Sequence, residues 1–181
     1  MRPRGIDQGV TSATSRDAAG PVRFSRPPGL HAIPPWFDLT DVEGRSVSLA
    51  DLIPMGPLVL VFFRGPSSLE CVEHLRDYRR RHAALYEAGA MLVAICRGDV
   101  EAARVLHETE QLPFRVLVDD GAVFSTWGLS SSSGELRTAT FVLDKAGVVR
   151  FRSIDEESGR VPSAQVLEWL RGHGGGGEAQ G

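Results

Sequence analysis

The residue with the clearest chemical potential in this sequence is Cys71, which ends the stretch FFRGPSSLEC. Residues 67–70 of that stretch match Ser-x-x-Glu, the capping-box pattern that begins many helices. With Ser67 as the cap, Cys71 falls four residues later, at the end of the first helical turn. The free N–H groups and the positive end of the helix dipole there favour a thiolate. The placement therefore predicts a nucleophilic thiol, and the alternative is a small apolar residue that packs into the core.

Several neighbours of Cys71 could tune or use this thiol. Arg64 would stabilise a thiolate, whereas Glu70, adjacent in sequence, would oppose it. His74 lies three residues after the cysteine and could act as a general base, although a half-exposed helix histidine is the more ordinary interpretation. Cys96, the second cysteine, could resolve an oxidised Cys71 if the two approach each other, but a buried residue at a strand end is the favoured interpretation.

The elements around the cysteines predict where they meet. PLVLVFF (57–63) and AMLVAIC (90–96) are apolar runs typical of strands buried on both faces, and FRVLVD (114–119) predicts a third strand. Helical spacing covers 68–88, and a further helix is predicted from Asp99, its N-cap, to Glu110. Alternating strands and helices indicate a parallel βαβ arrangement, whose chemistry usually lies at the carboxyl ends of the strands. The turn before Cys71 and the strand end at Cys96 should therefore share one sheet edge.

The remaining elements complete a mixed sheet. WFDLTDVEGRSVSL predicts two short strands around a turn at Glu43-Gly44, and residues 139–144 and 148–153 predict a hairpin. A last helix is expected over 163–170, between Pro162 and Gly172. The sequence thus predicts an α/β fold with a central mixed β-sheet flanked by helices.

Composition limits the other possibilities. The 181 residues are 42% hydrophobic with a net charge of −3, which suits one domain (33–172) and gives no general attraction to nucleic acid. No apolar run is long enough for a membrane span, and no secretory signal is recognisable. Residues 1–32 and the Gly-rich 173–181 are expected to be flexible tails. Two cysteines fit a reducing cytoplasm better than a disulfide framework.

Other polar groups have ordinary interpretations. Asp119-Asp120-Gly121 more often forms a turn or cap than a metal site, and His173 has no partner ligand near it in sequence. The basic run of residues 79–82 is expected to form a solvated helix face.

The quoted motifs, together with IPPWFDLTDVEGRSVSLADL and ATFVLDKAGVVRF, resemble the peroxiredoxin (alkyl hydroperoxide reductase/thiol-specific antioxidant) family over roughly residues 33–172. The resemblance implies a thioredoxin-like fold. It places Cys71 on the peroxidatic cysteine of that family and Ser68 on a threonine whose hydroxyl is retained. Arg64 stands where the family signature has proline, and Pro66 lies two residues later.

A second family motif lies in LRTATF. Thr140 matches its threonine, and Arg137 is the candidate for the arginine that holds peroxide and thiolate, one residue earlier than the usual spacing. The resemblance also has a poorer match in the dithiol thioredoxins, where Ser68 would replace the attacking cysteine and Ala139 the cis-proline. Because thiol exchange needs two thiols, a dithiol exchanger is disfavoured.

The resemblance implies a thiol peroxidase that reduces hydrogen peroxide or organic hydroperoxides through a single cysteine. No metal or organic cofactor is expected. The expected partners are the peroxide and an external thiol reductant, either a thioredoxin-like protein or a low-molecular-weight thiol, and a homodimer is an open option. Two alternatives remain. One is a redoxin scaffold that has lost catalysis and serves as a binding module, suggested by Arg64, Glu70, Ala139 and the shifted Arg137. The other is a monothiol redoxin that forms mixed disulfides.

Overall fold

The sheet of this protein has seven strands in the order β2-β1-β5-β4-β3-β6-β7. The computed structural model describes residues 26–155 and 160–173. The strands are β1 (Asp38–Asp41), β2 (Ser46–Ser48), β3 (Leu58–Phe63), β4 (Met91–Arg97), β5 (Arg115–Asp119), β6 (Ala139–Leu143) and β7 (Val149–Ile154). β3, β4 and β5 pair in parallel and the other pairs are antiparallel, so the predicted mixed sheet is confirmed.

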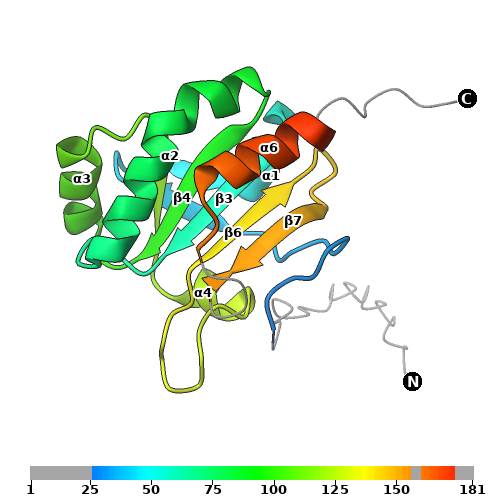
Figure 1. Ribbon diagram of the computed structural model, residues 1–181. Coiled ribbons are helices and arrows are strands. Elements are labelled where there is room, and N and C mark those ends of the chain that lie inside the picture. The colour runs from blue at the N-terminus through cyan, green and yellow to red at the C-terminus, as the bar shows by residue number, and fades with distance from the viewer. Residues whose placement is uncertain (1–25, 156–159, 174–181) are drawn as a thin grey trace, which may run out of the picture.

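Helices cover both faces of the sheet. They are α1 (Leu49–Leu52), η1 (Ile53–Met55), α2 (Leu69–Glu87), α3 (Val100–Thr109), α4 (Ala122–Thr126) and α6 (Ser163–His173). One apolar cluster joins the sheet to α2, α3 and α6, and a second joins the opposite face to α1, η1 and α4. Figure 1 shows α2 and α6 lying over the same face. The short elements α1, η1 and α4 were not predicted, because three to five residues are too few to show a helical period.

The central strand explains the position of the site. All six residues of β3 are buried, as expected for a strand covered by helices on both faces. In the parallel register Phe63 pairs with Cys96, so the two strand ends share one edge, as predicted. Gly65 has a φ of 149°, and a Cβ at this position would lie 3.1 Å from the carbonyl oxygen of Arg97. The turn that leads to Cys71 can therefore lie against the end of β4 only because a glycine stands there.

The start of the domain lies earlier than the sequence indicated. Residues 27–32 were counted with the N-terminal tail, but Pro27 and Pro28 are buried and their carbonyl oxygens accept hydrogen bonds from Arg152 at 3.3 and 3.2 Å. The backbone N–H of His31 also donates to the carbonyl of Val149 at 2.8 Å. Residues 27–32 therefore belong to the folded domain, and residues 1–25 of the predicted tail lie outside the described residues.

The last helix also runs further than predicted. Gly172 was expected to follow it, whereas α6 continues to His173. The imidazole of His173 stacks on Trp169, with ring centroids 4.4 Å apart, and its Nδ1 hydrogen-bonds the Trp169 carbonyl at 2.8 Å. These contacts tie down the final turn. Residues 174–181 lie outside the described residues, and none of the described helices is long and apolar enough to cross a membrane.

Candidate active site

Cys71 is the third residue of α2, and Ser68 caps the helix. The Ser68 hydroxyl oxygen accepts a hydrogen bond from the backbone N–H of Cys71 at 3.4 Å. The predicted cap at Ser67 is therefore wrong by one residue, because a turn that bonds the Ser68 N–H to the Gly65 carbonyl delays the helix start. Cys71 still lies in the first turn, where helical N–H groups lack partners and the dipole favours negative charge.

The thiol of Cys71 combines features of both predicted interpretations. Cys71 is only 1% exposed and belongs to the apolar cluster between α2 and the sheet. One side of the sulfur nevertheless faces a cation, since Nη2 of Arg160 lies 4.0 Å from Sγ. The site is therefore a thiol in a largely apolar setting with one positively charged neighbour.

Arg160 was not predicted from the sequence. It lies 89 residues from Cys71, just before α6 and outside the described helices and strands, so no helical or strand period in the sequence pointed to it. Its guanidinium is held on two sides, by Asp155 at 2.8 Å and by Glu70 at 3.1 Å. The Thr138 hydroxyl donates to the same Asp155 carboxylate. Two carboxylates thus fix the arginine next to the sulfur.

The charge state of Arg160 follows from these contacts. Burial by itself would lower the pKa of this guanidinium. The hydrogen bond to Asp155 and the attraction of Cys71, Asp155 and Glu70 outweigh burial, so the pKa of Arg160 is raised above its ordinary value. The group beside the thiol is accordingly a permanent cation.

The predicted residues Arg64 and Glu70 pair with each other. Nη2 of Arg64 lies 2.9 Å from Oε2 of Glu70, the same oxygen that binds Arg160. Arg64 is 45% exposed and its described partner is Glu70, not the sulfur. Glu70, expected to oppose the thiolate, instead lies between two arginines and helps to hold one of them in place.

A pocket of about 320 Å³ adjoins this network. Its lining consists of Arg64, Glu70, Leu136, Arg137, Thr138, Asp155 and Arg160. The structure therefore brings Arg64 and Arg137 into one pocket, while Ser68 and Cys71 lie together at the helix start. Arg160 belongs to the pocket lining and also contacts the sulfur, so it connects the two groups.

His74 is turned away from a role as general base. Its Nε2 donates a hydrogen bond to the carbonyl oxygen of Val161 at 3.0 Å, and its ring packs edge-on against Tyr78 with centroids 5.1 Å apart. Burial lowers the pKa of His74, which favours the neutral ring. The bond to Val161 already uses the Nε2 proton, so this histidine serves the structure of the site.

The second cysteine lies in a different environment. Cys96 is fully buried in β4, and both cysteines are free thiols. Burial, together with the negative charge of Asp119, raises the pKa of Cys96 to about 12. The Asp119 carboxylate accepts hydrogen bonds from the N–H groups of Val123 and Phe124 at 3.1 and 2.9 Å, which confirms its interpretation as a cap.

The threonine of the second family motif is part of the core. Thr140 is 1% exposed, and its hydroxyl pairs with the hydroxyl of Tyr78 at 3.4 Å. It thus fixes the position of α2 against β6.

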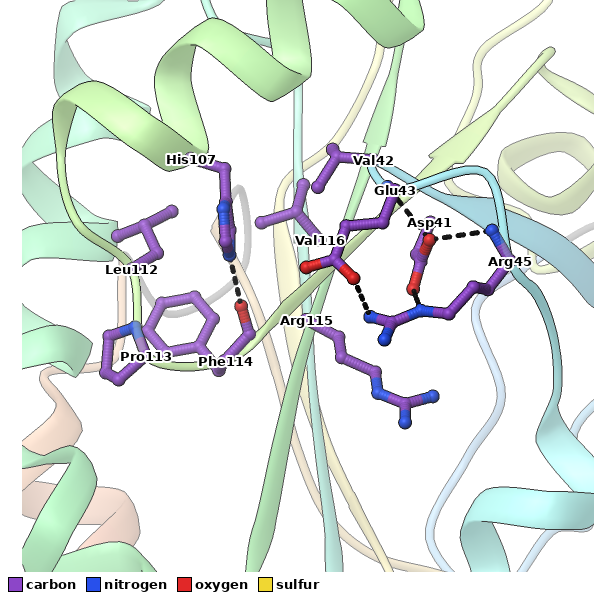
Figure 2. Close-up of a pocket in the computed structure, with 10 residues that line it drawn as sticks. All are labelled: Asp41, Val42, Glu43, Arg45, His107, Leu112, Pro113, Phe114, Arg115 and Val116. Atoms are coloured by element: carbon purple, nitrogen blue, oxygen red, sulfur yellow. Dashed lines mark hydrogen bonds and ion pairs between the residues drawn. The ribbon is translucent and has the colours of Figure 1, made fainter.

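A separate pocket of about 240 Å³ lies beside the β1–β2 turn and the end of α3. Figure 2 shows Arg45 closing on Asp41 and Glu43, at 2.8 and 2.7 Å, while His107 bonds the carbonyl of Phe114. No cysteine lines this pocket. Within residues 26–155 and 160–173, no group of three potential metal ligands occurs either.

Comparison with known proteins gives a consistent picture. The AhpC/TSA family model matches residues 31–152. The chain is 32% identical over 123 residues to the chloroplastic peroxiredoxin Q of Triticum aestivum, covering 66% of this chain and 56% of that protein. It is 30% identical over 141 residues to a protein of Mycobacterium tuberculosis named as a peroxiredoxin, covering 77% and 85%. The chain thus spans little more than half the length of the wheat relative.

Solved structures share the fold. The peroxidoxin BcpB of Mycobacterium tuberculosis superposes with a TM-score of 0.73 at 24% identity, covering 79% of this chain and 96% of that one. The bacterioferritin comigratory protein of Xanthomonas campestris gives a TM-score of 0.67 at 18% identity, covering 76% and 92%. The thioredoxin-like architecture implied by the sequence motifs is therefore confirmed.

Proposed function

Because the chain belongs to the AhpC/TSA family of peroxiredoxins, we propose that it is a thiol peroxidase that reduces hydrogen peroxide or organic hydroperoxides through Cys71. The Xanthomonas campestris protein that shares this fold is described by its alkyl peroxide reduction. The observation that carries the proposal is the contact of Arg160 with the Cys71 sulfur at 4.0 Å, at the first turn of a helix. A cation and a helix start at one thiol are the two common devices that keep a cysteine ionised.

The proposed chemistry begins with attack by the Cys71 thiolate on one peroxide oxygen. The O–O bond breaks, the sulfur becomes a sulfenic acid, and the other oxygen leaves as hydroxide or alkoxide, which takes a proton to give water or an alcohol. The leaving oxygen carries negative charge in the transition state. Arg160, with N–H groups of the first turn of α2, is placed to stabilise that charge, and Arg137 lines the pocket beside it.

An external thiol completes the proposed cycle. It attacks the sulfenic acid of Cys71, giving a mixed disulfide and water, and a second thiol then releases the cysteine. Cys96 is unsuited to this task, because burial and a raised pKa keep its sulfur protonated. The reductant is a thioredoxin-like protein or a low-molecular-weight thiol. A cytoplasmic location, which keeps both thiols reduced, and a homodimer belong to the same proposal.

The second candidate function is a non-catalytic redoxin scaffold that binds a partner. The 1% exposure of Cys71 and the presence of Arg64 in place of the signature proline favour it. A scaffold gives no reason, however, for a buried sulfur to share its environment with a doubly anchored arginine.

Peroxide turnover separates these functions. The full chain is mixed with hydrogen peroxide or cumene hydroperoxide and excess dithiothreitol, and peroxide loss is followed against a sample with no protein. Catalytic loss over many turnovers is the expected result. Peroxide loss that never exceeds the rate without protein, in a sample shown to be folded, would leave the scaffold as the function.

A further inference from the structure

The segment that carries Arg160 is fastened along one side of α2. Residues 160–163, which we call the strap, run from the thiol to the first residue of α6. Four side chains of α2, spaced four, three and four residues apart, bind the strap, which is the spacing of a single helix face. The contacts are Glu70 with Arg160 at 3.1 Å, His74 with Val161 at 3.0 Å, Asp77 with the Ser163 N–H at 2.7 Å, and Arg81 with the Ser163 hydroxyl at 3.4 Å.

The His74 contact fixes the backbone next to Arg160. Nε2 of His74 donates to the carbonyl oxygen of Val161, the residue that directly follows Arg160. Val161 is 4% exposed and its side chain belongs to the cluster beneath α2, which also contains Cys71. A shift of this carbonyl would therefore carry the guanidinium away from the sulfur.

We propose that His74 is a positioning residue that holds the strap, and through it Arg160, against the Cys71 sulfur. The role of this contact in catalysis rests on the proposed peroxidase function, whereas the hydrogen bond between His74 and Val161 is seen in the structure. His74 acts through Arg160, because its polar contact is with the strap backbone and not with the sulfur.

The other side chains of α2 that bind the strap hold Arg160 less directly. Glu70 is 72% exposed and shares its oxygen with Arg64, and ion pairs in water contribute little. Asp77 and Arg81 bind Ser163, three residues beyond Arg160, and so fix the start of α6. The His74 bond is half-buried and lies one residue from Arg160.

Groups around His74 keep it suited to this role. Asp155, Arg160 and Asp77 are the charged groups whose fields reach the ring, and Tyr78 covers one side of it. Burial lowers the pKa of His74, so the ring stays neutral at pH 7. The histidine thus adds no second charge near the thiol, and its effect is geometric.

The test measures thiol ionisation without any peroxide. Iodoacetamide alkylation of Cys71 is followed from pH 5 to 9 in a Cys96→Ala background, and the midpoint of the pH profile reports the thiolate. For His74→Phe we expect the midpoint to move to higher pH and the alkylation rate at pH 7 to fall about threefold to tenfold. His74→Gln, whose amide can also donate to the Val161 carbonyl, should keep the original profile.

A matched control is available on the same helix. His82 is also half-buried, but it lies eight residues beyond His74, and its ring packs near that of Phe114 at 6.0 Å rather than against Val161. His82→Phe should leave the profile unchanged. If His74→Phe does not fold, His74→Asn replaces it, because that shorter amide does not reach the carbonyl.

A double-mutant cycle decides whether His74 acts through Arg160. In the Arg160→Met background, His74→Phe should have no further effect on the midpoint. An unchanged midpoint in His74→Phe alone, or an equal shift with and without Arg160, would overturn the proposal. The profile needs no turnover, so a protein that lacks peroxidase activity but shows the expected shifts would refute the function and leave this inference standing.

Discussion

The two cysteines of this protein are buried to nearly the same extent, yet they lie in opposite electrostatic environments. Cys71 is 1% exposed and Cys96 is 0% exposed, and both belong to one apolar cluster. The sulfur of Cys71 faces Arg160 at a helix start, whereas Cys96 lies inside β4, near the carboxylate of Asp119. Burial alone therefore does not tell a reactive thiol from a structural one, and the sign of the nearest charge does.

Backbone geometry produces this difference. The N–H of Cys71 is bound by the Ser68 cap within the first turn of α2, where the unpaired N–H groups of the helix gather. Cys96 lies within the ladder between β3 and β5, paired with Phe63 on one side and Val118 on the other. A strand interior has no net dipole of comparable strength.

The largest expected effect is the difference in peroxide turnover between variants of the two cysteines. Cys71→Ser should reduce peroxide turnover at least about a hundredfold, because no other nucleophile is placed to form the sulfenic acid. Cys96→Ala should keep turnover within about threefold, although loss of the buried sulfur should cost about 1 kcal/mol of stability. Turnover of both variants is measured by peroxide loss with excess dithiothreitol. Equal losses in the two variants would erase the distinction between the cysteines.

The next effect concerns the arginines around Cys71. Arg160→Met should lower the second-order rate of peroxide reaction about tenfold, because one nearby charge shifts thiol ionisation by about that factor. Arg64→Met, which removes an exposed partner of Glu70, should change it no more than about twofold. Stopped-flow mixing with hydrogen peroxide measures both rates. A larger loss of rate in Arg64→Met than in Arg160→Met would show that Arg64, the arginine suggested by the sequence, supplies the positive charge at Cys71.

Cys96 should make the fold sensitive to alkali. The pKa of its thiol is raised from 9.0 to about 12 by burial, so above pH 9 the unfolded chain releases this proton while the folded protein keeps it. Stability should therefore fall by up to about 1.4 kcal/mol per pH unit between pH 9 and 12. Urea unfolding at pH 8, 9 and 10 measures the slope, which should flatten in Cys96→Ala. The raised pKa of Tyr78 adds its own loss only above pH 10.0.

The smallest expected effect is on stability and concerns which serine caps α2. Ser68→Ala should destabilise the protein by about 1 kcal/mol, because the first turn of α2 loses the acceptor for the Cys71 N–H. Ser67→Ala should have almost no effect, since Ser67 is exposed and does not cap the helix. Thermal unfolding of the two variants gives the comparison. A greater loss for Ser67→Ala would restore the capping box that the sequence pattern favoured.

The sequence predicted the parts of the fold that depend on local patterns. β3 and β4 are continuous apolar runs because both faces of the sheet are covered, and α2 shows a clear helical period. Their order along the chain was enough to place Phe63 and Cys96 at one sheet edge. The thiol was found in the same way, from a strand, a turn and a helix in succession.

Contacts between distant segments were not predictable in this way. Arg160 reaches Cys71 across 89 residues, and no spacing rule connects two positions so far apart in the sequence. The choice between Ser67 and Ser68 depended on a turn at Gly65 that either serine could have followed. Pro27 and Pro28 looked like tail residues because few large apolar residues surround them, but their carbonyl groups bind Arg152.

The central claim is that Cys71, and not Cys96, reacts with peroxide. The full chain is treated briefly with one equivalent of hydrogen peroxide, the sulfenic acid is trapped with dimedone, and the digested protein is analysed by mass spectrometry. We predict one dimedone adduct on the peptide that contains Cys71 and none on the peptide that contains Cys96. Modification of Cys96 in its place, or an unmodified Cys71 in folded protein, would contradict the account.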